Sequence, residues 1–151
     1  MMDGMDLDPQ GLRRMVYEGI LERGMPPSVK EIASHFRVAT DDARESLARL
    51  KIGKTVLVDP RSGEVWMAGP FSAKPTDYRV VGARTKWFAN CAWDMLGVAV
   101  LANECVTVET HCVDCGDEMV FDVDPRAGTT LDAIVHFLVP ARRWYDDIGF
   151  T

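Results

Sequence analysis

The stretch Thr55-Val56-Leu57-Val58-Asp59-Pro60-Arg61-Ser62-Gly63-Glu64-Val65-Trp66-Met67 decides the fold of the first half of the chain. Residues 55–58 and 64–67 have the β-branched and alternating character of strands, and the residues between them are typical of a turn. A hairpin is therefore predicted. Three predicted helices precede it, and three helices followed by a hairpin is the order of a winged-helix domain.

Each of the three helices has its own start and stop signals. The first, over residues 9–23, ends at Gly24 before two prolines. The second begins after Ser28, with Glu31 completing a capping box. Thr40 caps the third, which runs to Leu50 and is stopped by Gly53.

The second half is predicted to consist mainly of strands. Residues 69–77 are rich in proline and small residues, which indicates a linker. The elements expected beyond it are strands at 78–81, 104–110, 118–124 and 133–139, helices at 86–101 and from 141, and a tight turn at 112–116. The predicted fold class is α+β: a winged-helix-like domain at 1–75, then an antiparallel β core with flanking helices at 76–151.

The composition favours a folded cytoplasmic protein. Of the 151 residues, 47% are hydrophobic, so a packed core is expected. No run of about 18 apolar residues occurs, so no membrane span is expected. The acidic N-terminus lacks the apolar region of a signal peptide.

All four cysteines lie in the second half, at positions 91, 105, 112 and 115. In a cytosolic chain they are expected to be thiols, metal ligands or catalytic groups rather than disulfides. Cys112-x-x-Cys115, preceded by His111, is half of a zinc-ribbon pattern, but no second such pair exists. A reducible thiol pair or a plain turn is the favoured interpretation.

Cys91 and Asp94 are three residues apart near the start of the predicted helix at 86–101. With Asn90 as N-cap, Cys91 would lie in the first turn, where the helix dipole lowers the pKa of a thiol. The carboxyl would lie on the same face and could carry the thiol proton. The alternative is a buried structural cysteine beside an aspartate that stabilises the helix end. The tryptophans of this half are expected in the core or lining an apolar pocket (Trp87, Trp93 and Trp144).

DNA binding is not favoured by the third helix. It begins Thr40-Asp41-Asp42 and carries Glu45, and these acids would repel phosphate. The basic residues that partly offset them are Arg44, Arg49, Lys51 and Lys54. A packing or substrate-covering role is preferred, and a winged-helix regulator with a thiol-based metal or redox sensor is the alternative function.

The second half resembles the alkylmercury lyase family. The matching features are Asn90-Cys91-Ala92-Trp93-Asp94-Met95-Leu96, a strand ending in His111-Cys112, and the predicted strands at 119–125 and 134–140. The helical first half is also similar to that family, whose members carry a winged-helix-like region before the catalytic core.

The resemblance implies protonolysis of a carbon–mercury bond. It makes Cys91 a mercury-binding thiolate and Asp94 the proton shuttle. Mercury is then substrate and product, small-molecule thiols are co-reactants, and no metal or organic cofactor is expected. The expected partners are an organomercurial and cellular thiols, without nucleic acid or membrane. Cys112 matches a family cysteine taken as structural, and Cys115 is the weaker candidate for a further mercury ligand.

One catalytic residue of the family has no counterpart in the sequence. The second catalytic cysteine lies on a later segment, which residues 144–151 approach, so it is expected just beyond Thr151. A natural truncation, a fragment and a selenocysteine codon read as a stop are three open explanations. Full activity of this chain is therefore left open.

Overall fold

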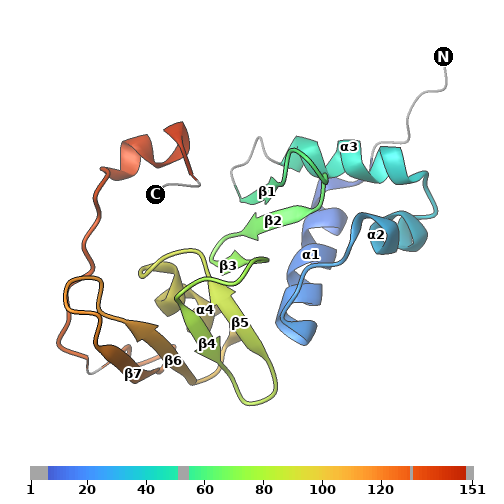
Figure 1. Cartoon of the computed structure of the whole chain (residues 1–151). Helices are drawn as coiled ribbons and strands as arrows, with labels where there is room; N and C mark the ends of the chain where they lie inside the picture. Colours follow the sequence, from blue (N-terminus) through green and yellow to red (C-terminus); the bar gives the residue numbers. More distant parts are fainter. Residues whose placement is uncertain (1–6, 51–54, 130, 149–151) are drawn as a thin grey trace.

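A computed structural model describes residues 7–50, 55–129 and 131–148 (Figure 1). The predicted helices of the first half are confirmed as α1 (Pro9–Arg23), α2 (Val29–Phe36) and α3 (Thr40–Leu50). The predicted hairpin is confirmed as β1 (Val56–Val58) and β2 (Val65–Ala68). Some predictions concern residues that the structure does not describe. They are those for the acidic N-terminus, for Lys51, Gly53 and Lys54, and for the last three residues.

Local capping explains where the first helices begin and end. The Asp8 carboxylate accepts a hydrogen bond from the Gly11 backbone N–H at 2.8 Å, which starts α1, and Gly24 ends it with φ +80°. Ser28 and Glu31 form the predicted capping box of α2. The predicted cap at Thr40 is wrong, because Thr40 is already the first residue of α3 and the Ala39 carbonyl accepts the N–H of Ala43.

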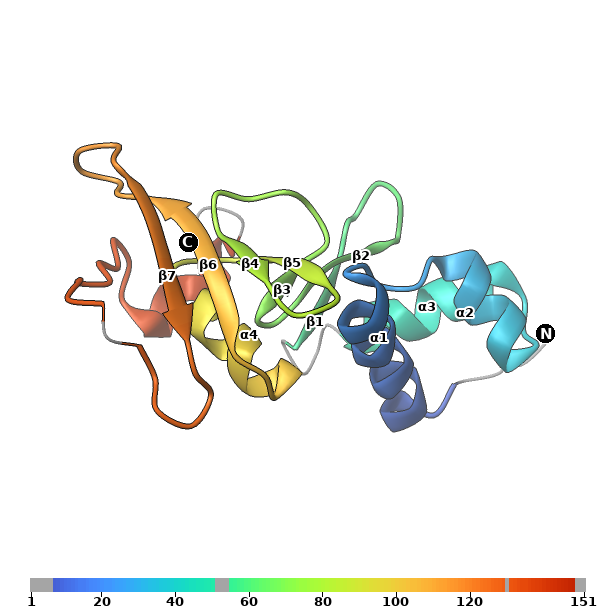
Figure 2. The same cartoon turned by 90° about the horizontal axis from the view of Figure 1, so that it is seen from below.

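One seven-stranded antiparallel sheet runs through the described chain, in the order β1-β2-β3-β5-β4-β6-β7. The strands beyond the hairpin are β3 (Phe71–Ser72), β4 (Arg79–Val81), β5 (Lys86–Ala89), β6 (Val106–His111) and β7 (Glu118–Val123). Helices α1–α3 gather beside β1 and β2 at one end, and the β6–β7 hairpin forms the other end (Figures 1 and 2). The fold is therefore α+β.

The predicted linker is wrong where it includes residues 71–72. These residues form β3, which pairs with β2 on one side and β5 on the other. Phe71 is only 1% exposed, so it belongs to the core. The sheet thus continues through the proposed linker, and the division into residues 1–75 and 76–151 stays a prediction.

The predicted helix over residues 86–101 is wrong in its first half. Lys86–Ala89 is the strand β5, and α4 covers only Asp94–Ala102. Along β5 the buried positions are every second residue, Trp87 and Ala89, which is the period of a strand. The Trp87 indole N–H also donates to the Ile20 carbonyl at 2.8 Å, which ties β5 to α1.

The predicted strand at 133–139 is also wrong. This described segment has no regular structure, and Ile134 and Leu138 are 94% and 79% exposed. Among the described strands, β7 pairs with β6 alone, so residues 133–139 do not extend the sheet. The helix expected from residue 141 is a 3₁₀ helix, η2 (Ala141–Asp146).

A single hydrophobic cluster joins the two halves of the described chain. It includes Leu12 and Val16 of α1, Phe71 of β3, Trp87 of β5 and Val98 of α4. No described helix is both long enough and apolar enough to cross a bilayer. This shared core fixes α4 and the turn before it relative to the hairpin β1–β2.

Candidate active site

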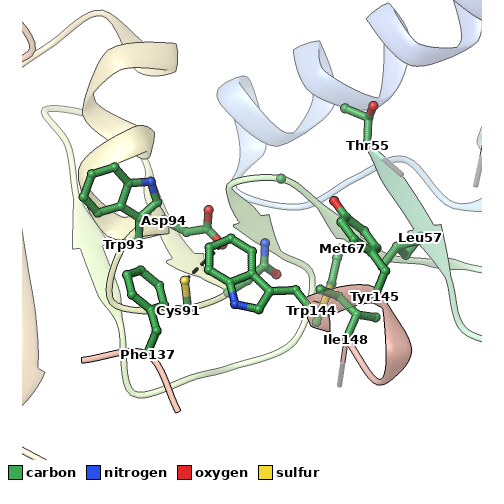
Figure 3. A pocket seen from close by; sticks show the side chains of 12 residues that line it. Thr55, Leu57, Met67, Cys91, Trp93, Asp94, Phe137, Trp144, Tyr145 and Ile148 are labelled. Atoms are coloured by element: carbon green, nitrogen blue, oxygen red, sulfur yellow. Dashed lines mark hydrogen bonds between the residues drawn. The ribbon is translucent and has the colours of Figure 1, made fainter. Parts of the chain in front are cut away.

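A cavity of about 160 Å³ lies between the β1–β2 hairpin, the start of α4 and the C-terminal segment (Figure 3). Its wall combines residues that are far apart in the sequence and mostly apolar. The lining residues are Thr55, Leu57, Met67, Gly69, Asn90, Cys91, Trp93, Asp94, Phe137, Trp144, Tyr145 and Ile148. Both residues singled out from the sequence, Cys91 and Asp94, are among them.

Cys91 and Asp94 face each other across a hydrogen bond. The Cys91 Sγ–H donates to Asp94 Oδ2 at 3.5 Å, and both side chains are half-buried (Figure 3). Asp94 is the first residue of α4, whereas Cys91 lies in the turn between β5 and α4. The prediction that Cys91 occupies the first helical turn with Asn90 as N-cap is therefore wrong, because α4 begins only at Asp94 and its N-cap is Trp93.

Burial controls the pKa values of this pair. It raises the pKa of the Cys91 thiol above its ordinary value of 9.0, and the Asp94 charge raises it further, although backbone N–H groups of Asp94 and Trp93 oppose the shift. The expected lowering of the Cys91 pKa is wrong, because desolvation exceeds the effect of these N–H groups. The pKa of Asp94 is raised by burial as well, against hydrogen bonds from Cys91 and Asn90 that lower it.

Asn90, which was predicted only as a helix cap and as part of the family-like motif, contributes a polar group to the site. Its backbone N–H donates to the Pro70 carbonyl at 3.1 Å, which fixes the end of β5. Its side chain acts on Asp94, and its Oδ1 is buried without a hydrogen-bond partner among the described residues. Asn90 is one of the residues that line the cavity, beside Cys91 and Asp94.

Aromatic rings form the wall opposite the hairpin. The Phe137 ring lies between two indoles, with centroids 6.4 Å from Trp93 and 5.1 Å from Trp144. The Trp144 indole N–H donates to the Val139 carbonyl at 2.7 Å, which holds η2 against the irregular segment before it. Trp93 is 57% exposed. Of the three tryptophans in the second half, Trp87 is in the core, and Trp93 and Trp144 line the cavity.

Two tyrosines lie close to the pair, and neither was predicted. Burial raises the pKa of Tyr17, Arg13 opposes the shift, and the Asp94 charge adds to it. The Tyr17 hydroxyl donates to the Gly69 carbonyl at 2.8 Å, so α1 contacts the cavity wall. The pKa of Tyr78 is raised first by burial and then by Cys91.

The other cysteines, all within the described residues, do not line this cavity. Cys105 is exposed, and Cys112 and Cys115 lie in the turn between β6 and β7. Within the described part of the chain, no group of three or more histidine, cysteine, aspartate or glutamate side chains is arranged to hold a metal ion. Cys115 is therefore not brought to Cys91 as a nearby thiol.

Comparisons with known proteins cover the segment that carries this candidate site. The family model described as alkylmercury lyase matches residues 71–150, which include Cys91, Asp94 and the aromatic wall. A solved structure, the crystal structure of the mercury-bound form of MerB2, matches with a TM-score of 0.63 and 17% identity. The match covers 82% of this chain and 60% of that one, so this chain spans less than two thirds of its length. No curated protein matches significantly.

Proposed function

Because the chain belongs to the alkylmercury lyase family, we propose that it cleaves carbon–mercury bonds of organomercurials by protonolysis. Cys91 binds the mercury and Asp94 carries the proton. The observation that carries this proposal is the 3.5 Å contact between Cys91 Sγ and Asp94 Oδ2 on the wall of the cavity.

The proposed reaction begins with an organomercury thiolate, R–Hg–SR′. Cys91 passes its thiol proton to Asp94 as its sulfur binds mercury, a soft metal that prefers thiolates. Asp94 then gives the proton to the carbon, and the carbon–mercury electron pair becomes the new C–H bond. The products are RH and Cys91–S–Hg–SR′. A second small-molecule thiol, R′SH, removes mercury as Hg(SR′)₂ and restores the Cys91 thiol.

The raised pKa values suit these roles. Burial raises the pKa of the Asp94 carboxyl. Once protonated, this carboxyl loses its proton less readily to water and keeps it for transfer to the carbon. The thiol stays protonated until mercury binds, so the proton needed by the product arrives with the nucleophile. The proposed shuttle therefore needs no other acid on the cavity wall.

The aromatic wall is proposed to hold the organic group. The rings of Trp93, Phe137 and Trp144 lie beside Cys91 (Figure 3), and a flat apolar group fits against such faces. We therefore propose arylmercury compounds as good substrates.

The first half is proposed to cover the site rather than to read DNA. We regard residues 1–75 as a winged-helix-like domain and residues 76–151 as the catalytic core. Leu57 and Met67 of the hairpin line the cavity. On α3, Arg44 pairs with Asp41 at 2.6 Å and Arg49 pairs with Glu45 at 3.0 Å, so their charges are partly neutralised. The regulator alternative therefore gains no support from the described helix.

Small-molecule thiols are the proposed co-reactants, and no resident metal or organic cofactor is part of the proposal. Because the reaction consumes reduced thiols, we propose that the protein works in the cytoplasm, where thiols are kept reduced.

The test is release of benzene and inorganic mercury from phenylmercury with excess small-molecule thiol. The wild-type chain is expected to release both, Cys91→Ser is expected to release neither above background, and Cys105→Ser serves as the matched control. Equal rates for Cys91→Ser and wild type would contradict the proposal.

A further inference from the structure

The turn between β6 and β7 carries two cysteines that the proposed reaction does not use. The Cys112 N–H donates to the Asp117 carbonyl, and the Gly116 N–H donates to the Cys112 carbonyl, both at 2.8 Å. Gly116 adopts φ +78°, which permits this tight closure. The turn projects beyond the sheet at the upper left of Figure 2, and Val113 at its tip is 88% exposed. The two thiols are therefore held together on an accessible loop.

The hydrogen bonds in this turn converge on one sulfur. Backbone N–H groups of Cys115 and Asp114 point at Cys112, the Cys115 thiol also donates to it, and together they lower its pKa. For Cys115 the Asp117 N–H acts to lower the pKa, but hydrogen bonds to the Asp117 carboxylate and to Cys112 raise it overall. The two sulfurs of this turn therefore lie within hydrogen-bonding distance of each other.

The number of ligands limits the cation that this pair can hold. A structural zinc site needs four ligands, and no described cluster supplies even three. Soft d¹⁰ cations such as Hg(II) are satisfied by two thiolates. We propose that Cys112 and Cys115 form a second mercury site, which chelates inorganic Hg(II) outside the cavity. The choice of Hg(II) among such cations rests on the proposed function, which releases it.

The proposed binding step is a ligand exchange without oxidation or reduction. Hg(SR′)₂ exchanges with the two thiols, forming two Hg–S bonds to the protein and two molecules of R′SH. After the first Hg–S bond forms, the second sulfur is already adjacent, so the second step is intramolecular. Chelation is what distinguishes this pair from a single exposed thiol such as Cys105.

The experiment measures how much glutathione is needed to remove Hg(II) from the full chain. Cys91→Ser is the parent, so that the cavity does not contribute. Adding Cys112→Ser or Cys115→Ser is expected to lower the glutathione concentration for half-removal at least about tenfold, because each leaves one thiol. Cys105→Ser is the matched control and should equal the parent. Circular dichroism of both pair variants checks that they fold.

Equal removal from the parent and from both folded pair variants would overturn the proposal, as would retention of Zn(II) as strong as that of Hg(II). A second assay separates this site from the proposed function. It measures phenylmercury cleavage by the Cys112→Ser/Cys115→Ser chain, in which Cys91 is intact. Cleavage without chelation rejects the turn site alone. Chelation without cleavage by the wild type supports the turn site and rejects the lyase proposal.

Discussion

The cavity and the β6–β7 turn each place a cysteine among backbone N–H donors, yet they affect it in opposite directions. At Cys91, burial exceeds the effect of the N–H groups and raises the pKa. At Cys112 hydrogen bonds from backbone N–H groups and from the Cys115 thiol outweigh desolvation, and the pKa is lowered. The comparison shows that desolvation decides the direction in which the pKa of a cysteine among N–H donors moves. A raised pKa suits a thiol that delivers its proton, and a lowered pKa suits a sulfur that binds a metal ion.

The largest expected effect comes from removing the proton carrier of the cavity. Asp94→Asn keeps the size of the side chain but removes its proton transfer, so kcat for phenylmercury should fall by about 10²–10⁴-fold. The measurement is benzene release under saturating substrate. Asp117→Asn, which changes a carboxylate beside the turn cysteines, is the matched control. Full activity in Asp94→Asn would show that another group supplies the proton.

The two thiols should differ in the pH at which they are alkylated. Brief labelling of the native chain with iodoacetamide from pH 6 to 10, followed by peptide mass spectrometry, gives a midpoint for each cysteine. The midpoint pH of Cys112 should lie below that of Cys91. Each pH unit between the two midpoints corresponds to a tenfold difference between their thiol deprotonation constants. Coincident midpoints would remove the contrast between the two sites.

Truncating the aromatic wall should have a moderate effect limited to the cavity. Trp144→Ala removes a ring beside Phe137, so KM for phenylmercury should rise about fivefold, equivalent to about 1 kcal/mol of aromatic contact. Methylmercury, which has no ring, should be affected less. Trp66→Ala, which alters an indole outside the cavity lining, is the control. An equal rise for both substrates would argue against a role in holding the aryl group.

The smallest expected effect is on stability at high pH. The folded-state pKa of Cys91 is raised, so the folded chain retains the thiol proton where the unfolded chain loses it. This contribution to stability is complete below the unfolded value of about 9 and is lost as pH rises through the folded value. Urea unfolding from pH 8 to 10.5 should show a shallower decline in Cys91→Ala than in wild type. The same decline in both would contradict the raised pKa.

Local signals in the sequence were sufficient for much of the fold. Caps at Ser28 and Gly24 and the turn residues 59–63 act within a few residues, so α1, α2 and the hairpin could be predicted. The stretch from Trp87 to Trp93 is apolar at both helical and strand spacing. Pairing of β5 with β3 and β4 selects the strand, and that pairing depends on residues distant in the sequence.

The chemistry of the site was only partly readable for the same reason. The spacing of Cys91 and Asp94 indicated that the two groups meet, and they do. The direction of the Cys91 pKa shift was missed because it depends on burial, and residues far along the chain such as Phe137 and Trp144 line the same cavity as Cys91. Asn90 was predicted to be a helix cap, so its position in the cavity wall was not predicted.

The central claim is that Cys91 and Asp94 together deliver one proton to the carbon of an organomercurial. It is tested most directly by a single turnover with the chain in excess over phenylmercury and no added thiol. Wild type should release one equivalent of benzene per phenylmercury and keep the mercury bound, while Cys91→Ser and Asp94→Asn should release essentially none. Benzene release by either variant at the wild-type rate would contradict the claim.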